Sequence, residues 1–170
     1  MKVQSSTIEN KYLRVKSINI GACLYEVYDK KKKINLILNL GPLKNYSSKN
    51  FYVGATCGRY AGRISNSKFN IKNKIFKLEE NEGKNTLHGG KIGFDRLEWK
   101  IHHHSKNKII YQLLSKNLDQ GFPGDLNSEC TFEIKNKSLF IKYQYKSNQL
   151  THVNLTNHSY WNLNKNKKET

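Results

Sequence analysis

The chain has 170 residues, which is enough for one domain with a buried core. Its 30 lysines and arginines against 13 aspartates and glutamates give a formal net charge of +17, a value typical of nucleic-acid or anionic-membrane binding when the basic residues cluster. Here they are spread along a chain that is also rich in asparagine and isoleucine, so the composition indicates drift towards A and T in the gene and predicts no specific nucleic-acid partner.

The beginning of the chain lacks the apolar core of a secretory signal peptide, and no apolar stretch reaches the ~20 residues of a membrane helix. We therefore expect a cytoplasmic protein without a membrane partner. The three cysteines, Cys23, Cys57 and Cys130, are far apart and form no Cys-x-x-Cys pair. This spacing favours neither a disulfide framework nor a zinc site, and we expect no metal and no cofactor.

Short segments with alternating apolar residues predict strands along the chain. The first clear alternation is Ile34, Leu36, Leu38 and Leu40, which we expect to face the core. Just before it, the four lysines at positions 30–33 lie between two apolar segments, so we predict a solvated hairpin loop there. Around position 73, Phe69 and Ile71 lead through a short turn into Ile75 and Phe76, which predicts a hairpin.

A second hairpin is predicted at 130–145. Cys130, Phe132 and Ile134 lead through Asn136 and Lys137 into an alternation whose inward residues are Leu139, Ile141, Tyr143 and Tyr145. The three histidines at 102–104 do not predict a metal site, because neighbouring side chains of a strand point to opposite faces. No segment carries a sustained helical stripe, so the fold class expected is all-β, an antiparallel sandwich.

Four segments contain most of the turn-forming and chemically reactive residues. Residues 54–69 are Gly-Ala-Thr-Cys-Gly-Arg-Tyr-Ala-Gly-Arg-Ile-Ser-Asn-Ser-Lys-Phe, and residues 85–99 are Asn-Thr-Leu-His-Gly-Gly-Lys-Ile-Gly-Phe-Asp-Arg-Leu-Glu-Trp. Residues 121–125 are Gly-Phe-Pro-Gly-Asp, and residues 154–163 are Asn-Leu-Thr-Asn-His-Ser-Tyr-Trp-Asn-Leu. In the last segment His158 follows a β-branched apolar stretch, which places an imidazole that titrates near pH ~6.5 at the end of a strand.

In sequence, order and spacing these segments resemble the aldose 1-epimerase (galactose mutarotase) family. The resemblance implies that family's large twisted β-sandwich, the supersandwich, and implies that 121–125 is a turn between two strands. Residues 1–170 are expected to be the N-terminal portion of a single domain whose C-terminal half is absent. The implied activity is interconversion of the α and β anomers of an aldohexose such as glucose or galactose.

Anomer interconversion requires an acid at the ring oxygen and a base at the C1 hydroxyl, so that the ring opens, the aldehyde turns and the ring closes again. The resemblance implies that His158 is the acid, that His88 is the family's second catalytic histidine, and that Gly62, Arg63, Ser159 and Tyr160 help to bind the sugar. The fixed fork of donors on Arg63 suits a vicinal diol. We predict that His88, Arg63 and His158 face one concave surface.

Several of these residues also have plain structural interpretations. Arg59 and Arg63 are open to interpretation as surface charges at a strand end, and Gly89 and Gly90 either form only a turn or let the backbone approach a ligand closely. Trp161, where the family more often has phenylalanine, is expected to pack in the core.

Departures from the family pattern bear on activity. Gly62 replaces a usual asparagine, which removes one possible hydrogen bond to sugar. His152 replaces a usual proline. The family's catalytic glutamate and a sugar-binding aspartate lie beyond the segments matched, and none of Glu129, Glu133 or Glu169 is in a segment that resembles theirs. We therefore expect impaired activity, and self-association through uncovered sheet edges.

Three alternatives to an impaired epimerase stay open. A hexose-phosphate epimerase of the same fold would need additional basic residues for the phosphate. A remnant that binds carbohydrate without catalysis would keep the sugar contacts alone. A basic protein that binds nucleic acid through charge would use the lysines and the interleaved aromatic residues of 143–146.

Overall fold

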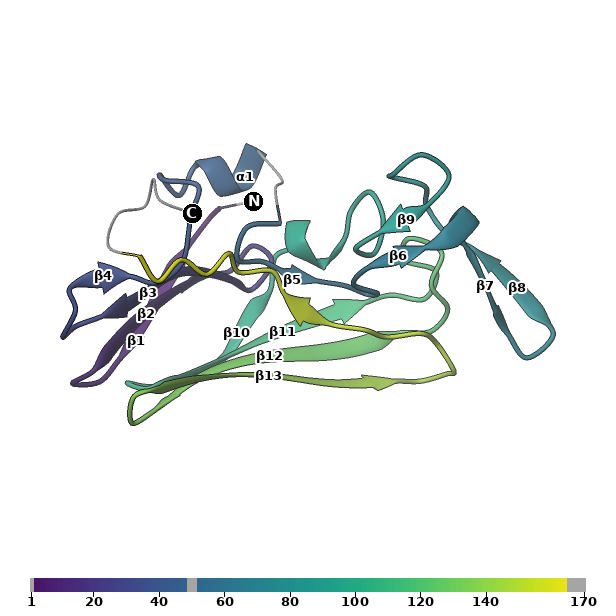
Figure 1. The fold of residues 1–170 in the computed structure, drawn as a ribbon. Coiled ribbons are helices and arrows are strands. Elements are labelled where there is room, and N and C mark those ends of the chain that lie inside the picture. The colour runs from purple at the N-terminus through teal and green to yellow at the C-terminus, as the bar shows by residue number, and fades with distance from the viewer. Residues whose placement is uncertain (1, 49–51, 165–170) are drawn as a thin grey trace.

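The computed structural model describes residues 2–48 and 52–164 and is almost entirely antiparallel β-structure (Figure 1). One four-stranded sheet has the order β1-β2-β3-β4, and the other has the order β10-β11-β12-β13. Their bounds are β1 Ser5–Glu9, β2 Leu13–Ile18, β3 Cys23–Asp29, β4 Ile34–Asn35, β10 Lys100–His104, β11 Lys108–Ser115, β12 Leu126–Lys135 and β13 Ser138–Ser147.

Three two-stranded pairs and three short helical turns complete the described fold. The pairs are β5 (Thr56–Cys57) with β14 (Thr156–Asn157), β6 (Arg63–Ile64) with β9 (Thr86–Leu87), and β7 (Lys68–Ile71) with β8 (Lys74–Lys77). The helical turns are α1 (Asn45–Ser48) and 3-10 turns at Ser65–Ser67 and Phe94–Arg96. No helix among the described residues is long and apolar enough to cross a membrane.

The core lies between the two larger sheets. Ile8 and Val15 from the first sheet pack in one buried cluster with Tyr111 and Phe132 from the second. The hydroxyl groups of Ser17 and Tyr111 lie 2.8 Å apart and join the sheets through a buried hydrogen bond. The predicted antiparallel sandwich is therefore confirmed, and its driving force is the removal of these apolar faces from water.

The predicted hairpins are confirmed. Strands β7 and β8 pair across residues 72–73, and β12 and β13 pair across Asn136 and Lys137, with Lys135 opposite Ser138. The four lysines at 30–33 form the turn between β3 and β4, and the 121–125 segment lies in the connection between β11 and β12. The histidines at 102–104 are exposed on β10, and no group of His, Cys, Asp or Glu among the residues described is placed to hold a metal ion.

The predicted inward face of 34–40 is only partly correct: Leu36 packs against the core cluster, but Leu38 does not. Strand β4 ends at Asn35, whose side-chain oxygen accepts the backbone N–H of Val27 and whose amide donates to the carbonyl of Ile37. This side chain takes the chain out of the ladder, so the alternation stops and Ile37 becomes the buried residue at 1% exposure. Leu38 is 41% exposed instead of facing the core.

Strand β13 follows its predicted alternation for three of four residues. Leu139, Ile141 and Tyr143 are half-buried against the core cluster, and the Tyr143 hydroxyl lies 3.1 Å from the Thr56 hydroxyl on β5. Tyr145 was predicted to face inward as well, but it is 55% exposed, because it lies on the strand beyond the residues that pack on the cluster. Among the strands described, β13 pairs with β12 alone and forms the edge of its sheet.

Candidate functional site

The imidazoles of His88 and His158 come together although they are far apart in sequence. Each follows a short strand, His88 after β9 and His158 after β14. The ring centroids are 5.2 Å apart and the ring planes are nearly perpendicular, at 87°. Two imidazoles, the side chain that most often serves as acid or base in enzymes, therefore lie in ring contact, which is an arrangement suited to acid–base chemistry.

Backbone hydrogen bonds fix His158 against the 54–57 segment. The N–H of His158 donates to the carbonyl of Ala55 at 2.8 Å, and the N–H of Gly54 donates to the carbonyl of His158 at 3.0 Å. The Asn157 side-chain amide donates to the Gly54 carbonyl at 2.9 Å. These bonds extend the β5–β14 pair by one residue and hold the backbone of His158 against the 54–57 segment.

His88 is held through Gly62 by two reciprocal hydrogen bonds. The N–H of His88 donates to the carbonyl of Gly62 at 3.0 Å, and the N–H of Gly62 donates to Nδ1 of His88 at 3.1 Å. Because Nδ1 accepts a hydrogen bond, the proton of the neutral ring is on Nε2. Burial lowers the pKa of His88, and the charges of His158 and Arg63 lower it further, so the neutral form is favoured.

This assignment predicts a pH dependence of stability. The folded pKa of His88 is below the ordinary value of 6.5, so the unfolded chain takes up the proton first. The contribution of His88 to the free energy of unfolding is complete well above pH 6.5. It decreases as the pH falls through 6.5, until the ring is protonated in the folded chain as well. Urea unfolding between pH 7 and pH 5 is expected to show this loss.

The matched variant for that measurement is His88→Asn, which keeps an acceptor near the Gly62 N–H but cannot titrate. Its free energy of unfolding should vary less over the same range. The carboxylates with lowered pKa, Glu9, Glu82 and Asp125, lose their contributions at lower pH, below their ordinary values of 4.5 and 3.8. An equal slope in the wild type and the variant would contradict the assignment.

The glycines after His88 serve packing within the protein. Gly89 has φ +96°, and a Cβ built there would lie 1.8 Å from the carbonyl oxygen of Gly58. Gly90 has φ +108° and lies against the side chain of Gln120. Both glycines therefore lie in a turn with positive φ, and the missing side chain of Gly89 brings the His88 turn against the 58–62 segment.

Arg63 is on β6, opposite Leu87 of β9, which is the residue before His88. Its exposed guanidinium forms two hydrogen bonds with Glu82, Nε to Oε2 at 2.6 Å and Nη2 to Oε1 at 2.7 Å. Both charges act on the pKa of His88, Arg63 lowering it and Glu82 raising it. A sugar hydroxyl would have to share the guanidinium with this carboxylate.

Two other predicted site residues, Tyr160 and Ser159, differ in their exposure. The ring of Tyr160 lies 5.2 Å from that of His158 and is 43% exposed. The Ser159 hydroxyl oxygen is buried and has no hydrogen-bond partner among the residues described. One residue was missed by the sequence analysis: the ring of Tyr52 contacts both His88 and His158. Its sequence signal is no more than an aromatic residue two positions before the 54–69 segment.

Two structural interpretations are corrected. Arg59 is not a surface charge: it is 2% exposed and donates to the carbonyls of Ser115, Lys116, Pro123 and Gly124. Trp161 is not in the core of the described fold, because it is 52% exposed and only its backbone bridges to Ile37.

Two carboxylates considered in the sequence analysis, Glu129 and Glu133, do not lie at this site. Glu129 accepts a hydrogen bond from Gln112 on the neighbouring strand, and Glu133 pairs with Lys135. Glu169 lies outside the described residues. The carboxylates whose charges act on the cluster of rings are Glu82, which is paired with Arg63, and Asp95, whose side chain is buried.

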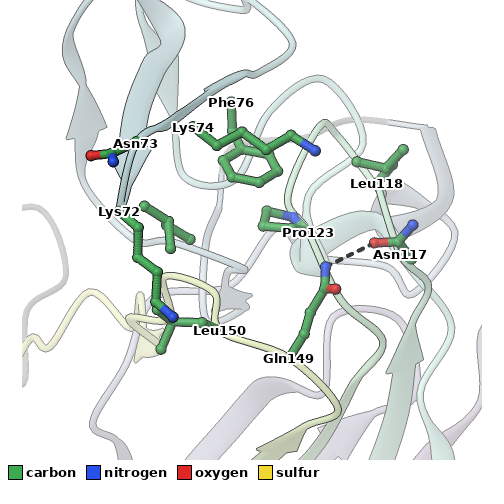
Figure 2. Close-up of a pocket in the computed structure, with 10 residues that line it drawn as sticks. Lys72, Asn73, Lys74, Phe76, Asn117, Leu118, Pro123, Gln149 and Leu150 are labelled. Atoms are coloured by element: carbon green, nitrogen blue, oxygen red, sulfur yellow. Dashed lines mark hydrogen bonds between the residues drawn. The ribbon is translucent and has the colours of Figure 1, made fainter.

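A pocket of about 650 Å³ opens elsewhere on the molecule (Figure 2). The β7–β8 hairpin forms one side of it with Lys72, Lys74 and Phe76, and Gln149 donates to Asn117 on the other side at 3.2 Å. Neither site histidine lines this pocket, and its lining residues contain no carboxylate or imidazole. The pocket is therefore separate from the paired imidazoles, and its titratable lining residues are Lys72 and Lys74.

Comparison with known proteins agrees with the observed fold. Residues 4–170 match the family model described as aldose 1-epimerase. The galactose mutarotase of Sus scrofa is 37% identical over 164 residues, which are 95% of this chain and 48% of that protein. The aldose 1-epimerase of Haemophilus influenzae is 36% identical over 166 residues, which are 94% of this chain and 48% of that protein.

Two solved structures have a similar fold over nearly the whole chain. A GalM/aldose epimerase homologue from C. elegans superposes with a TM-score of 0.89 and 28% identity, covering 95% of this chain and 51% of that one. Galactose 1-epimerase from Lactobacillus acidophilus NCFM gives a TM-score of 0.85 and 29% identity, covering 96% and 54%. The chain spans about half the length of the curated relatives it matches. From the family match and these relatives, the chain belongs to the aldose 1-epimerase family, a family of isomerases.

Proposed function

We propose that this chain binds an aldohexose at His88 and His158 and provides the acid side of anomer interconversion. The observation that carries the proposal is the contact of the two imidazoles at 5.2 Å, within a chain that matches the aldose 1-epimerase family. In the proposed reaction His158 donates a proton to the ring oxygen while the C1 hydroxyl loses its proton. The bond between C1 and the ring oxygen breaks, the aldehyde turns, and the ring closes on the other face.

His88 has a different proposed role. With Nδ1 occupied by the Gly62 N–H, its neutral ring presents an Nε2–H donor, which suits a hydroxyl oxygen of the sugar. The lowered pKa keeps this ring neutral at physiological pH, so a second positive charge does not oppose the protonated state that His158 needs as an acid. In this proposal His88 is a hydrogen-bond donor to the sugar and His158 is the proton donor.

The base is the weak part of the proposed site. Glu82 has both carboxylate oxygens engaged by Arg63, and its pKa is lowered by that hydrogen bond, which makes it a poor proton acceptor. We therefore propose that the chain still binds the sugar but catalyses the interconversion of its anomers only weakly. A phosphate-binding variant of this function is not favoured, because Arg63, whose charge acts on His88, is already paired with the carboxylate of Glu82.

The test is a titration of the 170-residue chain with D-galactose and D-glucose, followed by the imidazole signals in NMR spectra. We expect the signals of His88 and His158 to shift with sugar concentration, and His88→Ala and His158→Ala to weaken the binding roughly tenfold or more, because each removes a hydrogen bond to the ligand. His102→Ala, an exposed histidine on β10, is the matched control and should leave affinity unchanged. Equal affinity in all three variants would contradict the site.

The edge strand β13 supports the proposal of self-association. It is ten residues long, pairs with β12 alone among the described strands, and carries Phe140 at 51% and Tyr145 at 55% exposure. A long edge with exposed apolar side chains offers unpaired backbone groups to another strand.

A further inference from the structure

Tyr52 lies against both site histidines. Its ring centroid is 4.7 Å from that of His88, with the planes at 64°, and 5.9 Å from that of His158, with the planes at 32°. The ring of Tyr160 extends the cluster on the other side of His158 at 5.2 Å. Tyr160 is exposed whereas Tyr52 is half-buried, so Tyr52 is at the inner end of a cluster of four rings.

The backbone that carries Tyr52 is docked onto the strand that carries His158. The N–H of Ala55 donates to the carbonyl of Tyr52 at 3.1 Å and closes a tight turn. Within this turn Gly54 donates to the carbonyl of His158 and accepts from the N–H of Leu24 on β3 at 2.8 Å. Gly54 has φ +75°, and a Cβ there would lie 2.1 Å from the Leu24 carbonyl oxygen, so the turn is fixed by close backbone contact.

We propose that Tyr52 is a positioning residue of the sugar site: its ring limits the rotation of both imidazoles and keeps water from their inner side. This inference rests on the proposed function. An imidazole turns about a broad χ2 minimum unless its neighbours restrict it. The edge-to-face contact with His88 and the tilted contact with His158 restrict this rotation.

Tyr52 acts through its ring and not through charge. Burial and the nearby Asp95 raise the pKa of Tyr52, so its hydroxyl stays protonated at neutral pH. The groups that set the charge state of His88 are His158, Arg63 and Glu82, and burial is the first cause of its lowered pKa. A variant without the ring opens the inner side of His88 to water while those three groups stay in place.

The experiment compares Tyr52→Phe, which keeps the ring, with Tyr52→Leu, which does not, in the complete chain. Imidazole titrations followed by 15N NMR report the pKa and tautomer of each histidine without any sugar. In the wild type and Tyr52→Phe, the pKa of His88 should stay below 6.5, with Nδ1 as the acceptor. In Tyr52→Leu it should rise towards 6.5, and affinity for D-galactose should fall about three- to tenfold, the equivalent of one ring contact.

Several outcomes separate the claims. Unchanged imidazole titrations and galactose affinity in Tyr52→Leu would overturn the positioning role. The same result in Tyr52→Phe as in Tyr52→Leu would overturn the assignment to the ring, because the hydroxyl would then be responsible. Changed titrations in a chain whose wild type binds no galactose would support the positioning of the imidazoles and overturn the proposed function. Tyr52→Met is a second ringless variant should Tyr52→Leu fail to fold, with His102 as the reference signal.

Discussion

In polarimetry of freshly dissolved α-D-glucose, the purified 170-residue chain is expected to speed mutarotation only weakly. His158 can offer a proton to the ring oxygen, but the base side depends on Glu82, which is bound to Arg63, or on water. Loss of a positioned general base typically lowers a rate about 10²–10⁴-fold. The expected rate constant is lower than that of a full-length relative, such as the galactose mutarotase of Sus scrofa, by this factor.

Two variants decide what the remaining rate means. His158→Ala should bring the chain to the buffer rate if His158 is the acid. Glu82→Gln should leave the small rate unchanged, since its carboxylate is engaged by Arg63. A large wild-type rate that disappears in Glu82→Gln would show that Glu82 releases Arg63 in the presence of sugar and serves as the base. A large rate unaffected by His158→Ala would refute the assignment of the acid.

The parts of the fold that sequence predicted well are those set by local pattern. The β7–β8 and β12–β13 hairpins follow from alternation on both sides of a two-residue turn, and both have the predicted strands. The pairing of His88 with His158 came from the family resemblance, not from local pattern, because the hydrogen bonds that bring them together link positions such as Gly54 and His158.

These misses share one physical origin: a side chain or backbone group finds its partner in another segment of the chain. Asn35 bonds to Val27 and ends an alternation that would otherwise have buried Leu38. Gly89 lies against the carbonyl oxygen of Gly58, a contact that its place in a turn does not reveal. Tyr52 is part of the site only because a turn docks it there. Periodicity and turn propensity carry no information on such contacts.

Arg59 is the clearest example, because an arginine is rarely buried unless specific partners accept hydrogen bonds from most of its N–H groups. Its Nη1 donates to the carbonyls of Pro123 and Gly124 at 3.0 and 2.8 Å. Its Nη2 donates to the carbonyls of Ser115 and Lys116 and to the Ser115 hydroxyl, which in turn donates to Asp119. One side chain therefore holds both ends of the connection between β11 and β12.

Arg59→Met is expected to lower the free energy of unfolding by roughly 3–5 kcal/mol, because it removes the guanidinium donor from four carbonyls and the nearby positive charge from Asp119. Of the four, the Lys116 carbonyl still accepts the N–H of Asp119. Arg59→Lys should be intermediate, since an ammonium keeps the charge but not the planar fork. Urea unfolding measures both, with Arg14→Met as the control, a half-exposed arginine paired with Glu26 for which a loss of about 0–1 kcal/mol is expected.

The effect of Arg59→Met should extend to the site as well. The carbonyl of Arg59 accepts the N–H of Asn154, and the carbonyl of Gly58 accepts the N–H of Phe94 and lies against Gly89. The 58–62 segment therefore joins the chain that leads to His158 with the turn that follows His88. If Arg59→Met proves as stable as the wild type, or alters stability without changing the imidazole signals of His88 and His158, this segment does not couple the two histidines.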